Sequence, residues 1–230
     1  RTRGIENLLP AIQSGERIHG DECGPNHSFK PGFMWDAGIQ PLIPYGIRGV
    51  LWYQGESNAE TAPRVREHDQ LFPLLIRQWR EHWAQGDFPF FYVQLPALKR
   101  PQWPAFRDGQ RRILDQLENV GMAVTIDTGH PSNVHPELKK PVGRRLAKLA
   151  LGTTYGRSLV PSGPLFVNAE RDGDSLVVSF KHSGGGLKSS DGQPLRFFAV
   201  CGKDGVFHAA NAKIIRHDAI AVSSSAVSEP

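Results

Sequence analysis

The chain has 230 residues, of which 39% are hydrophobic, 22% charged and 9% aromatic. These values are typical of a globular protein with a buried core, and they exclude the disordered and fibrous classes. The formal net charge of +4 is spread along the chain without a basic run, which argues against nucleic-acid binding. No apolar stretch reaches the roughly 18 residues of a membrane-spanning helix. Cys23 and Cys201 form no paired motif, so neither a disulfide scaffold nor a zinc knuckle is supported.

The first residues, from Arg1 to Gly4, lack the apolar core of a signal peptide. We interpret the chain as a processed product, a subcloned domain or a fragment. Residues 1–32 are rich in turn formers and charge and show no sustained periodicity, so we expect an irregular lead-in segment.

From residue 33 onward the predicted elements alternate between helices and strands. A short helix over 34–43 precedes a buried strand over 48–53, and an amphipathic helix runs from 62 to about 84. The second strand covers 90–95, and a loop holding Trp103 leads into a helix with apolar residues from Phe106 to Leu117. The third strand covers 122–126. A last helix begins near Pro141 and buries Val142, Leu146, Leu149 and Leu151.

This alternation predicts an α/β fold, because parallel strands need long crossovers that helices usually supply. We assign residues 33–160 to this domain. Residues 161–230 instead contain short strands between turn clusters, which predicts a small antiparallel β region. Its expected strands cover 176–180, 197–200, 206–207 and 219–222.

Ligands of open parallel sheets bind beyond the carboxyl ends of the strands, so the loops after the strands are the candidate site. The loop Gln54-Gly55-Glu56-Ser57-Asn58 follows the first strand. A glycine amide and the Asn58 side chain could together stabilise a developing oxyanion. The alternative is a turn in which Ser57 or Asn58 caps the following helix.

The loop after the third strand offers two histidines. His135 could act as a general base near neutral pH, and His130 is its rival; either could equally be a structural residue. Asp127 lies three residues before His130, but it could instead cap a turn. Ser132 and Asn133, which precede His135 at the corresponding distance, do not ionise.

Two clusters could in principle hold a metal, one of His19, Asp21, Glu22 and Cys23, the other of Asp127, His130 and His135. Neither has the spacing of a known metal motif, and we expect none. Trp103 could line a sugar or acyl site, or it could fold back on the sheet. The aromatic residues at helical or strand spacing are interpreted as core: Trp79, Trp83, Phe90 and Phe91.

The run from Trp52 to Ala59, WYQGESNA, resembles the signature of sialate O-acetylesterases and related carbohydrate acetylesterases of the SGNH hydrolase superfamily. Several further segments are similar to that family, as is the β-rich tail. They are Leu71-Phe72-Pro73-Leu74-Leu75-Ile76 with Trp79-Arg80, Phe91-Tyr92-Val93-Gln94-Leu95, Arg107-Asp108-Gly109-Gln110, Met122 to Asp127, His135-Pro136, and Val142 to Ala147.

The resemblance implies a flavodoxin-like three-layer sheet, present here in part, and a serine esterase that needs no metal or cofactor. Such an enzyme removes O-acetyl groups from sialic acid or other acetylated sugars through an acyl-enzyme. In this comparison His135 matches the base. The residues Gly55 to Asn58 match the oxyanion and substrate block, with Gln54 and Glu56 as polar supports.

The chain departs from the family pattern at two places. The family nucleophile lies in an early Gly-Gln-Ser block, which this chain lacks; Gln13-Ser14-Gly15 is the nearest string and has no preceding strand. We therefore expect the nucleophile on an N-terminal segment or a partner chain, since Ser57 belongs to a different block. The aspartate that often orients the histidine is replaced by Asn133, so Asp127, a carbonyl or a simple dyad could take that role.

Two other functions fit the same residues. The chain could be a non-catalytic carbohydrate-binding or scaffolding module that keeps the fold, or an acetylxylan-type esterase with the same chemistry. Acetylated glycans suggest an extracytoplasmic location, although the sequence shows no targeting segment.

Overall fold

The computed structural model describes residues 32–230. The lead-in predicted over residues 1–31, with Cys23 and the Gln13-Ser14-Gly15 string, lies outside the described residues. The described residues form two compact units. One contains residues 32–50 and Leu71–Phe88, and the other contains Leu51–Gln70 and Pro89–Pro230.

The first unit is helical. The short helix expected over 34–43 is present as two segments, η1 (Trp35–Ile39) and η2 (Gln40–Leu42). The predicted long helix is confirmed as α2 (Ala62–Trp83), whose second half lies in this unit. Beyond α2, the carbonyl of Phe88 accepts hydrogen bonds from Nε and Nη2 of Arg80 at 3.1 and 3.0 Å, which fixes the turn that ends the helix.

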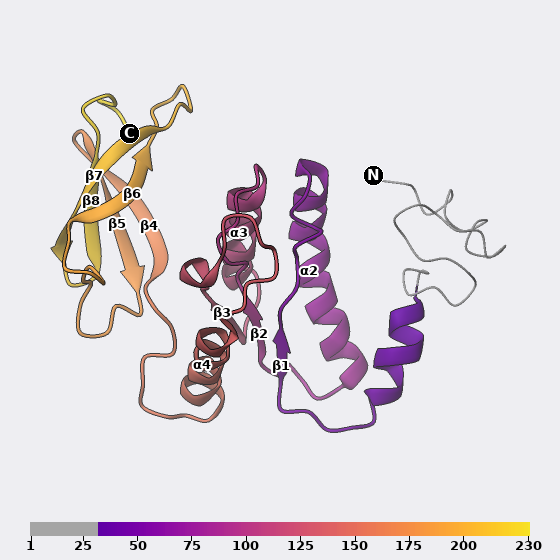
Figure 1. Ribbon diagram of the computed structural model, residues 1–230. Coiled ribbons are helices and arrows are strands. Elements are labelled where there is room, and N and C mark those ends of the chain that lie inside the picture. Colours follow the sequence, from indigo (N-terminus) through magenta and orange to yellow (C-terminus); the bar gives the residue numbers. More distant parts are fainter. Residues whose placement is uncertain (1–31) are drawn as a thin grey trace. The chain divides into compact units, whose positions relative to one another are not determined.

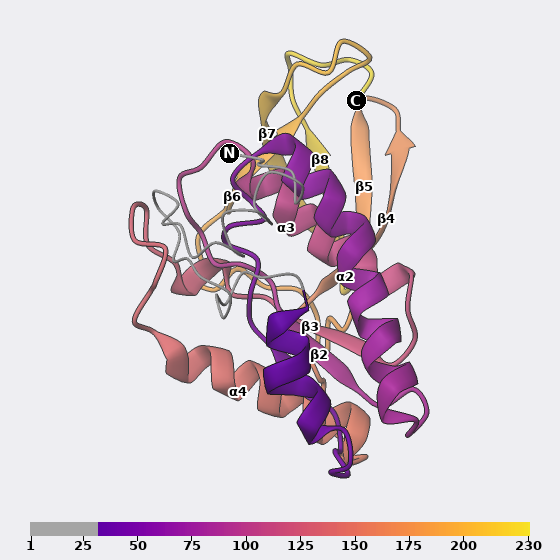
Figure 2. The same cartoon turned by 90° about the vertical axis from the view of Figure 1, so that its right-hand side faces the viewer.

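The second unit contains a three-stranded parallel sheet in the order β1-β2-β3 (Figure 1). The strands are β1 (Val50–Trp52), which begins one residue before this unit, β2 (Phe90–Val93) and β3 (Val120–Ala123). β2 and β3 pair in parallel with Phe90 opposite Val120, and they run side by side in both views (Figure 2). All four residues of β2 are buried, as the apolar run predicts for a central strand.

Helices cover both faces of this sheet. Phe91 and Val93 point toward α4 (Lys139–Leu149), and the shared core is completed by Ala123, Val142, Leu146 and Leu149. Tyr92 points the other way, and its hydroxyl donates a hydrogen bond of 2.8 Å to the carbonyl of Gln110 in α3 (Trp103–Arg112). Because successive strand residues face opposite sides, α3 and α4 form separate layers. The expected three-layer α/β arrangement is confirmed.

Short helical turns extend these helices or follow a strand. They are η3 (Ile113–Asp115), η4 (Ile126–Thr128) and η5 (Ala150–Thr154).

The C-terminal region is a five-stranded antiparallel sheet in the order β4-β5-β8-β7-β6. Its strands are β4 (Leu165–Asp172), β5 (Ser175–Lys181), β6 (Leu195–Val200), β7 (His208–Arg216) and β8 (Ala219–Ser223). A cluster of Val200, Ala212, Ile220, Val222 and Val227 forms its core. The predicted antiparallel β region is therefore confirmed.

Several predicted elements differ from the structure. The strand expected at 206–207 is absent from the described structure. β4 and β7 were not predicted, because their exposed faces carry many polar residues. β3 ends at Ala123 rather than at 126, where its partner β2 also ends. β1 is not buried as expected, since Leu51 is 62% exposed at the edge of the sheet. Leu151 is also exposed rather than buried.

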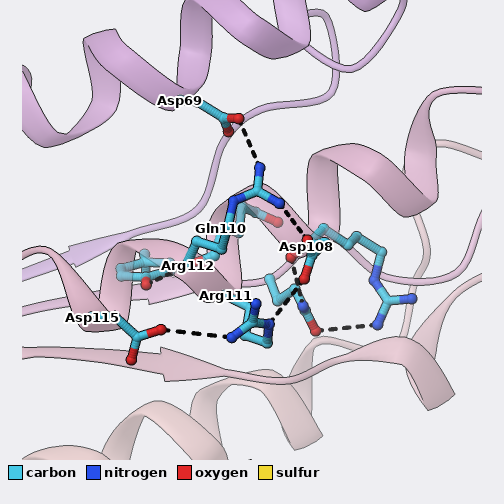
Figure 3. A network of polar contacts seen from close by, with 9 residues as sticks. Asp69, Asp108, Gln110, Arg111, Arg112 and Asp115 are labelled. Atoms are coloured by element: carbon cyan, nitrogen blue, oxygen red, sulfur yellow. Dashed lines mark hydrogen bonds and ion pairs between the residues drawn. The ribbon is translucent and has the colours of Figure 1, made fainter. Parts of the chain in front are cut away.

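A charged network joins the first half of α2 to α3 (Figure 3). Asp69 accepts a hydrogen bond of 2.8 Å from Nη2 of Arg112, and Arg112 also pairs with Asp108 one turn earlier on α3. A side chain at Gly109 would overlap the Asp69 carboxylate, so the glycine leaves room for this ion pair. The network fixes α3 beside the segment that follows β1.

We expect Gly121→Ala to lower the free energy of unfolding by about 1–3 kcal/mol, because it overpacks the layer between β2 and α4. A Cβ at Gly121 would lie 2.8 Å from Cδ1 of Phe91 and 3.1 Å from Cδ2 of Leu149. Urea unfolding of the variant and of the wild-type chain measures the difference.

Gly143→Ala is the matched control. Gly143 is exposed on α4, and within the described part of the chain nothing lies within 4 Å of the added Cβ. Alanine there should leave stability unchanged or raise it by up to about 1 kcal/mol, because it favours the helix. Equal stability of the two variants would contradict the close packing at Gly121.

Candidate active site

The candidate site lies at the edge of the parallel sheet where its strands end. Tyr53–Asn58 follow β1, Gln94 follows β2, and residues 124–135 follow β3. The hydroxyl of Thr125 donates a hydrogen bond of 2.5 Å to the carbonyl of Gln94, which ties the second and third loops together. This edge is where α/β sheets bind ligands.

Gly55 has a backbone conformation and surroundings that only glycine suits. Its φ is +139°, a value that other residues rarely adopt. An added Cβ would lie 2.6 and 2.7 Å from two ring carbons of Phe106, a fully buried residue of α3. The carbonyl of Gly55 accepts a hydrogen bond of 3.0 Å from the amide of Ala59, which closes the turn. The loop is therefore held tightly against α3.

Asn58 is oriented by Gln54. Nε2 of Gln54 donates a hydrogen bond of 2.7 Å to Oδ1 of Asn58. This contact leaves the amide nitrogen of Asn58 as the group free to donate, and among residues 32–230 it has no partner. An oriented amide donor beside a glycine turn is the arrangement that an oxyanion requires.

The alternative role of this loop as a helix cap is wrong. α2 begins at Ala62, and the capping position belongs to Thr61, whose Oγ1 lies 3.5 Å from the amide of Arg64. The Ser57 carbonyl accepts a hydrogen bond of 3.2 Å from Nη1 of Arg64, while the Ser57 hydroxyl has no hydrogen-bond partner in the described part of the chain. Ser57 is exposed.

Glu56 lies half-buried in the same turn. Burial, together with the negative charge of Glu56, raises the pKa of the Tyr53 hydroxyl above its ordinary value. Tyr53 therefore stays neutral near pH 7. The ammonium of Lys139 lies over the Tyr53 ring, 4.6 Å from its centroid. This contact joins the loop after β1 to the start of α4.

The loop that carries His135 is anchored next to the Gly55 loop. Val134 packs against the apolar cluster that contains Phe106, the residue beneath Gly55. The other buried members of this cluster are Ala59, Val65, Leu95 and Trp103. His135 itself is exposed, and among the described residues no hydrogen bond reaches its ring. The structure thus brings the loop of His135 and the loop of Asn58 onto one cluster.

Neither residue predicted to orient His135 contacts its ring. The Asn133 side-chain oxygen accepts a hydrogen bond of 2.9 Å from the backbone amide of His135. Both carboxylate oxygens of Asp127 accept hydrogen bonds of 2.6 Å from Arg145, and these bonds hold the pKa of Asp127 below its ordinary value. Their roles as orienting groups stay predictions without geometric support in this structure.

His130 has a structural role in the same loop. Its Nδ1 accepts hydrogen bonds from the backbone amides of Ser132 and Asn133 at 3.2 and 2.9 Å. An accepting Nδ1 places the ring proton of neutral His130 on Nε2. His130 therefore shapes the loop that presents His135.

Two polar groups beneath the site, Arg107 and Gln110, were not predicted from the sequence as site residues. Gln94 and Arg107 pair reciprocally, and Gln110 is buried while binding the amide of Leu95 and the carbonyl of Val93 at 2.9 and 3.1 Å. A signal existed for Gln110. It is a polar residue within the apolar helical stripe of Phe106 and Ile113, and such a residue needs buried partners.

Trp103 does not line the candidate site. It lies in the first turn of α3, is 2% exposed, and donates its indole hydrogen to the carbonyl of Pro96 at 2.6 Å. The alternative in which it folds back on the sheet is confirmed. The His19, Asp21, Glu22 and Cys23 cluster lies outside the described residues, and within residues 32–230 no group of three potential metal ligands assembles.

Comparisons with known proteins place these features in a family. Residues 36–152 match the family model described as carbohydrate esterase, sialic acid-specific acetylesterase. The chain belongs to this family. Half of the chain is covered by the match, including the Gly55 turn and the loop of His135.

Sialate O-acetylesterases from mammals also align with more than half of the chain. The mouse (Mus musculus) sialate O-acetylesterase is 33% identical over 154 residues, which cover 57% of this chain and 28% of that protein. The human (Homo sapiens) sialate O-acetylesterase is 31% identical over 158 residues, or 59% and 30% of the two chains. This chain therefore spans less than a third of the length of these relatives.

A solved structure agrees with the family fold. The crystal structure of a carbohydrate acetylesterase from Xanthomonas citri superposes with a TM-score of 0.81 and 37% identity. The likeness covers 86% of this chain and 46% of that chain, so the present chain spans less than half of the bacterial enzyme. Among the helices that the structure describes, none is long and apolar enough to cross a membrane.

We expect Asp127→Asn to destabilise the chain by about 0.5–1 kcal/mol at pH 7, because its ion pair with Arg145 is partly exposed. The lowered pKa of Asp127 means that this stabilisation is complete above the ordinary carboxyl pKa of about 3.9 and disappears as the pH falls through the lower folded value. Urea unfolding at pH 7 and near pH 2 should show a larger difference between wild type and variant at pH 7.

Asp172→Asn is the control, because Asp172 is exposed at the end of β4 and has no ion pair within the described residues. It should not change stability at either pH. A stability difference for Asp127→Asn that is as large near pH 2 as at pH 7 would contradict the assignment of Asp127 to this ion pair.

Proposed function

We propose that the chain contributes the oxyanion and base residues of a carbohydrate esterase that removes O-acetyl groups from sialic acid or other acetylated sugars. The observation that carries the proposal is the orientation of Asn58. Gln54 binds the side-chain oxygen of Asn58, so the Asn58 amide nitrogen can donate to a ligand. The Gly55 turn beside it and the loop of His135 pack on the same apolar cluster. The membership of the family and the solved acetylesterase structure support the same chemistry.

The reaction proceeds through a serine acyl-enzyme. A serine oxygen attacks the acetyl carbonyl carbon while His135 takes the serine proton, and the carbonyl oxygen becomes an oxyanion held by the Gly55 amide and Asn58. The C–O bond to the sugar then breaks, and the sugar oxygen receives the proton from His135. Water, deprotonated by His135, attacks the acetyl-serine, and acetate and the free serine are released.

The nucleophilic serine belongs to a segment that precedes this sequence or to a partner chain. Two observations support this assignment. Among residues 32–230 no base forms a hydrogen bond with the Ser57 hydroxyl, and β1 is the edge strand of the described sheet, with Leu51 62% exposed. A strand added at this edge would end beside the Gly55 loop, where parallel strands place their carboxyl ends.

The reaction predicts different effects for the two histidines of the site loop. In a polypeptide that includes the serine-bearing segment, His135→Ala should lower kcat for 4-nitrophenyl acetate by about 10²–10⁴-fold, because it removes the general base. His130→Ala should have a much smaller effect, since this ring shapes the loop through its backbone contacts. Steady-state kinetics with both variants measures the contrast.

Thermal unfolding of both variants controls for loss of the fold. Wild-type turnover after His135→Ala would overturn the assignment of the base, and a larger loss after His130→Ala would transfer that role to His130. If the complete polypeptide binds glycans but releases no acetate, the chain is a carbohydrate-binding module instead. Activity on acetylated xylan alone would indicate the acetylxylan-type alternative.

A further inference from the structure

His68 on α2 packs against the Phe106 ring. It lies in the second turn of the helix and is 5% exposed. Its ring centroid lies 4.4 Å from that of Phe106, and the two ring planes are tilted by 47°. The outer end of the same Phe106 ring meets Gly55, since Cζ and Cε1 are the atoms that an added Cβ there would overlap. The Phe106 ring thus contacts both His68 and the Gly55 turn.

The start of α2 is also joined to the Gly55 turn through the chain. The amide of Ala59 donates a hydrogen bond of 3.0 Å to the carbonyl of Gly55, and α2 begins soon afterwards at Ala62. Ala59 itself belongs to the apolar cluster of Phe106. A movement of His68 away from Phe106 would therefore pull on the turn that the Ala59 amide closes.

The surroundings of His68 suit a neutral imidazole. Burial lowers the pKa of His68 from 6.5 to about 4, and the negative charge of Asp69 opposes this shift only in part. Asp69 is itself paired with Arg112, whose Nη2 donates to it at 2.8 Å (Figure 3). A buried charge is costly unless it is fully paired. A proton on His68 would place such a charge against the Phe106 ring.

Other charged groups surround His68 on α3 and in the loop before α2. They are Glu56, Glu60, Arg107, Asp108, Arg111 and Arg112. The acids Asp108 and Glu60 are paired with arginines. Among the described residues, Asp69 is the charge that acts on the pKa of His68. The charge of a protonated His68 would therefore be neutralised only in part.

We propose that His68 is a positioning residue, which as a neutral imidazole holds the Phe106 ring beneath the Gly55 turn, and that a proton on His68 loosens this turn. The effect on catalysis rests on the esterase function proposed above, whereas the effect on the turn is a property of this chain. His68 contacts Phe106, so it acts on the oxyanion donors only through the turn. The candidate site thus contains a second pH-dependent group besides His135.

The pKa values define the pH interval in which the turn loosens. The pKa of His68 is about 4 with the turn closed and near the ordinary 6.5 when opening exposes the ring to water. Protons therefore favour the open form. The stabilisation is complete above pH 6.5, weakens as the pH falls, and reaches its lower limit below about pH 4. Between about pH 7.5 and 5.5 the equilibrium constant for opening should rise about tenfold.

Hydrogen exchange at the Ala59 amide measures this opening, because that amide donates the hydrogen bond that closes the turn. In the 230-residue chain its protection factor, which corrects for the intrinsic pH dependence of exchange, should fall about tenfold from about pH 7.5 to 5.5. In His68→Phe, which keeps a ring against Phe106 but cannot take up a proton, the factor should stay constant. His68→Gln does not ionise either, and it gives the same test should His68→Phe fail to fold.

His217→Phe is the matched control. His217 lies in the turn between β7 and β8, and its side chain is 73% exposed. The same substitution there should leave the pH dependence at Ala59 as in the wild type. The amide of Phe180, which donates to the carbonyl of Asp218 in the antiparallel sheet, is the reference for global unfolding. Its protection should fall less than that of Ala59.

Turnover separates positioning from stability alone. The enzyme is the complete polypeptide with the serine-bearing segment, assayed with 4-nitrophenyl acetate at about pH 8, where His68 is neutral. His68→Gln removes the ring that packs on Phe106, so kcat should fall by about threefold or more with little change in KM, because the oxyanion forms only in the transition state. His68→Phe should retain more of the turnover than His68→Gln.

The outcomes separate the role of His68 from the proposed function. A constant protection factor at Ala59 in the wild type, a fall that persists in His68→Phe, or an equal fall at Phe180 would overturn the inference. Equal kcat values for His68→Gln and the wild type would also overturn the positioning role. If the complete polypeptide hydrolyses no ester, the proposed function fails, while the exchange result still decides whether His68 holds the turn.

Discussion

The contact between the Phe106 ring and Gly55 is the constraint on which the candidate site depends. It fixes the loop after β1 against α3 at a distance that leaves no room for a side chain. The same ring belongs to the cluster that receives Val134, so the loop of His135 is positioned by the same buried surface. Arg107, the next residue on α3, is placed at this edge by the same helix. One buried aromatic residue thus positions both the Gly55 loop and the loop of His135.

Much of the fold could be predicted because its signals are local. The all-apolar run of β2, the helical stripes of α2 and α4 and the polar QGESN loop each depend on neighbouring residues in the sequence. β1 shows the limit of this reasoning. Its residues are as apolar as those of a central strand, yet whether Leu51 is buried depends on what lies beyond the sheet edge, which no local pattern reports.

The site could be predicted only in part for the same reason. The block from Gln54 to Asn58 is contiguous, so its motif is visible in the sequence. Asp127 pairs with Arg145, a residue 18 positions away in the second turn of α4, and no spacing rule distinguishes that partner from His135. Arg107 and Gln94 likewise meet through the packing of α3 on the sheet. Contacts between elements decide these roles.

The chain belongs to the acetylesterase family but spans less than half of the bacterial enzyme and less than a third of the mammalian relatives. The partial length agrees with the proposed arrangement of the site, in which this chain supplies the base and the oxyanion donors and another segment supplies the nucleophile. Labelling with an organophosphonate serine probe, with the adduct mapped by mass spectrometry, tests that division most directly. In the complete polypeptide the adduct should lie on a serine outside residues 1–230, and the 230-residue chain alone should remain unlabelled. An adduct on Ser57 would contradict the account.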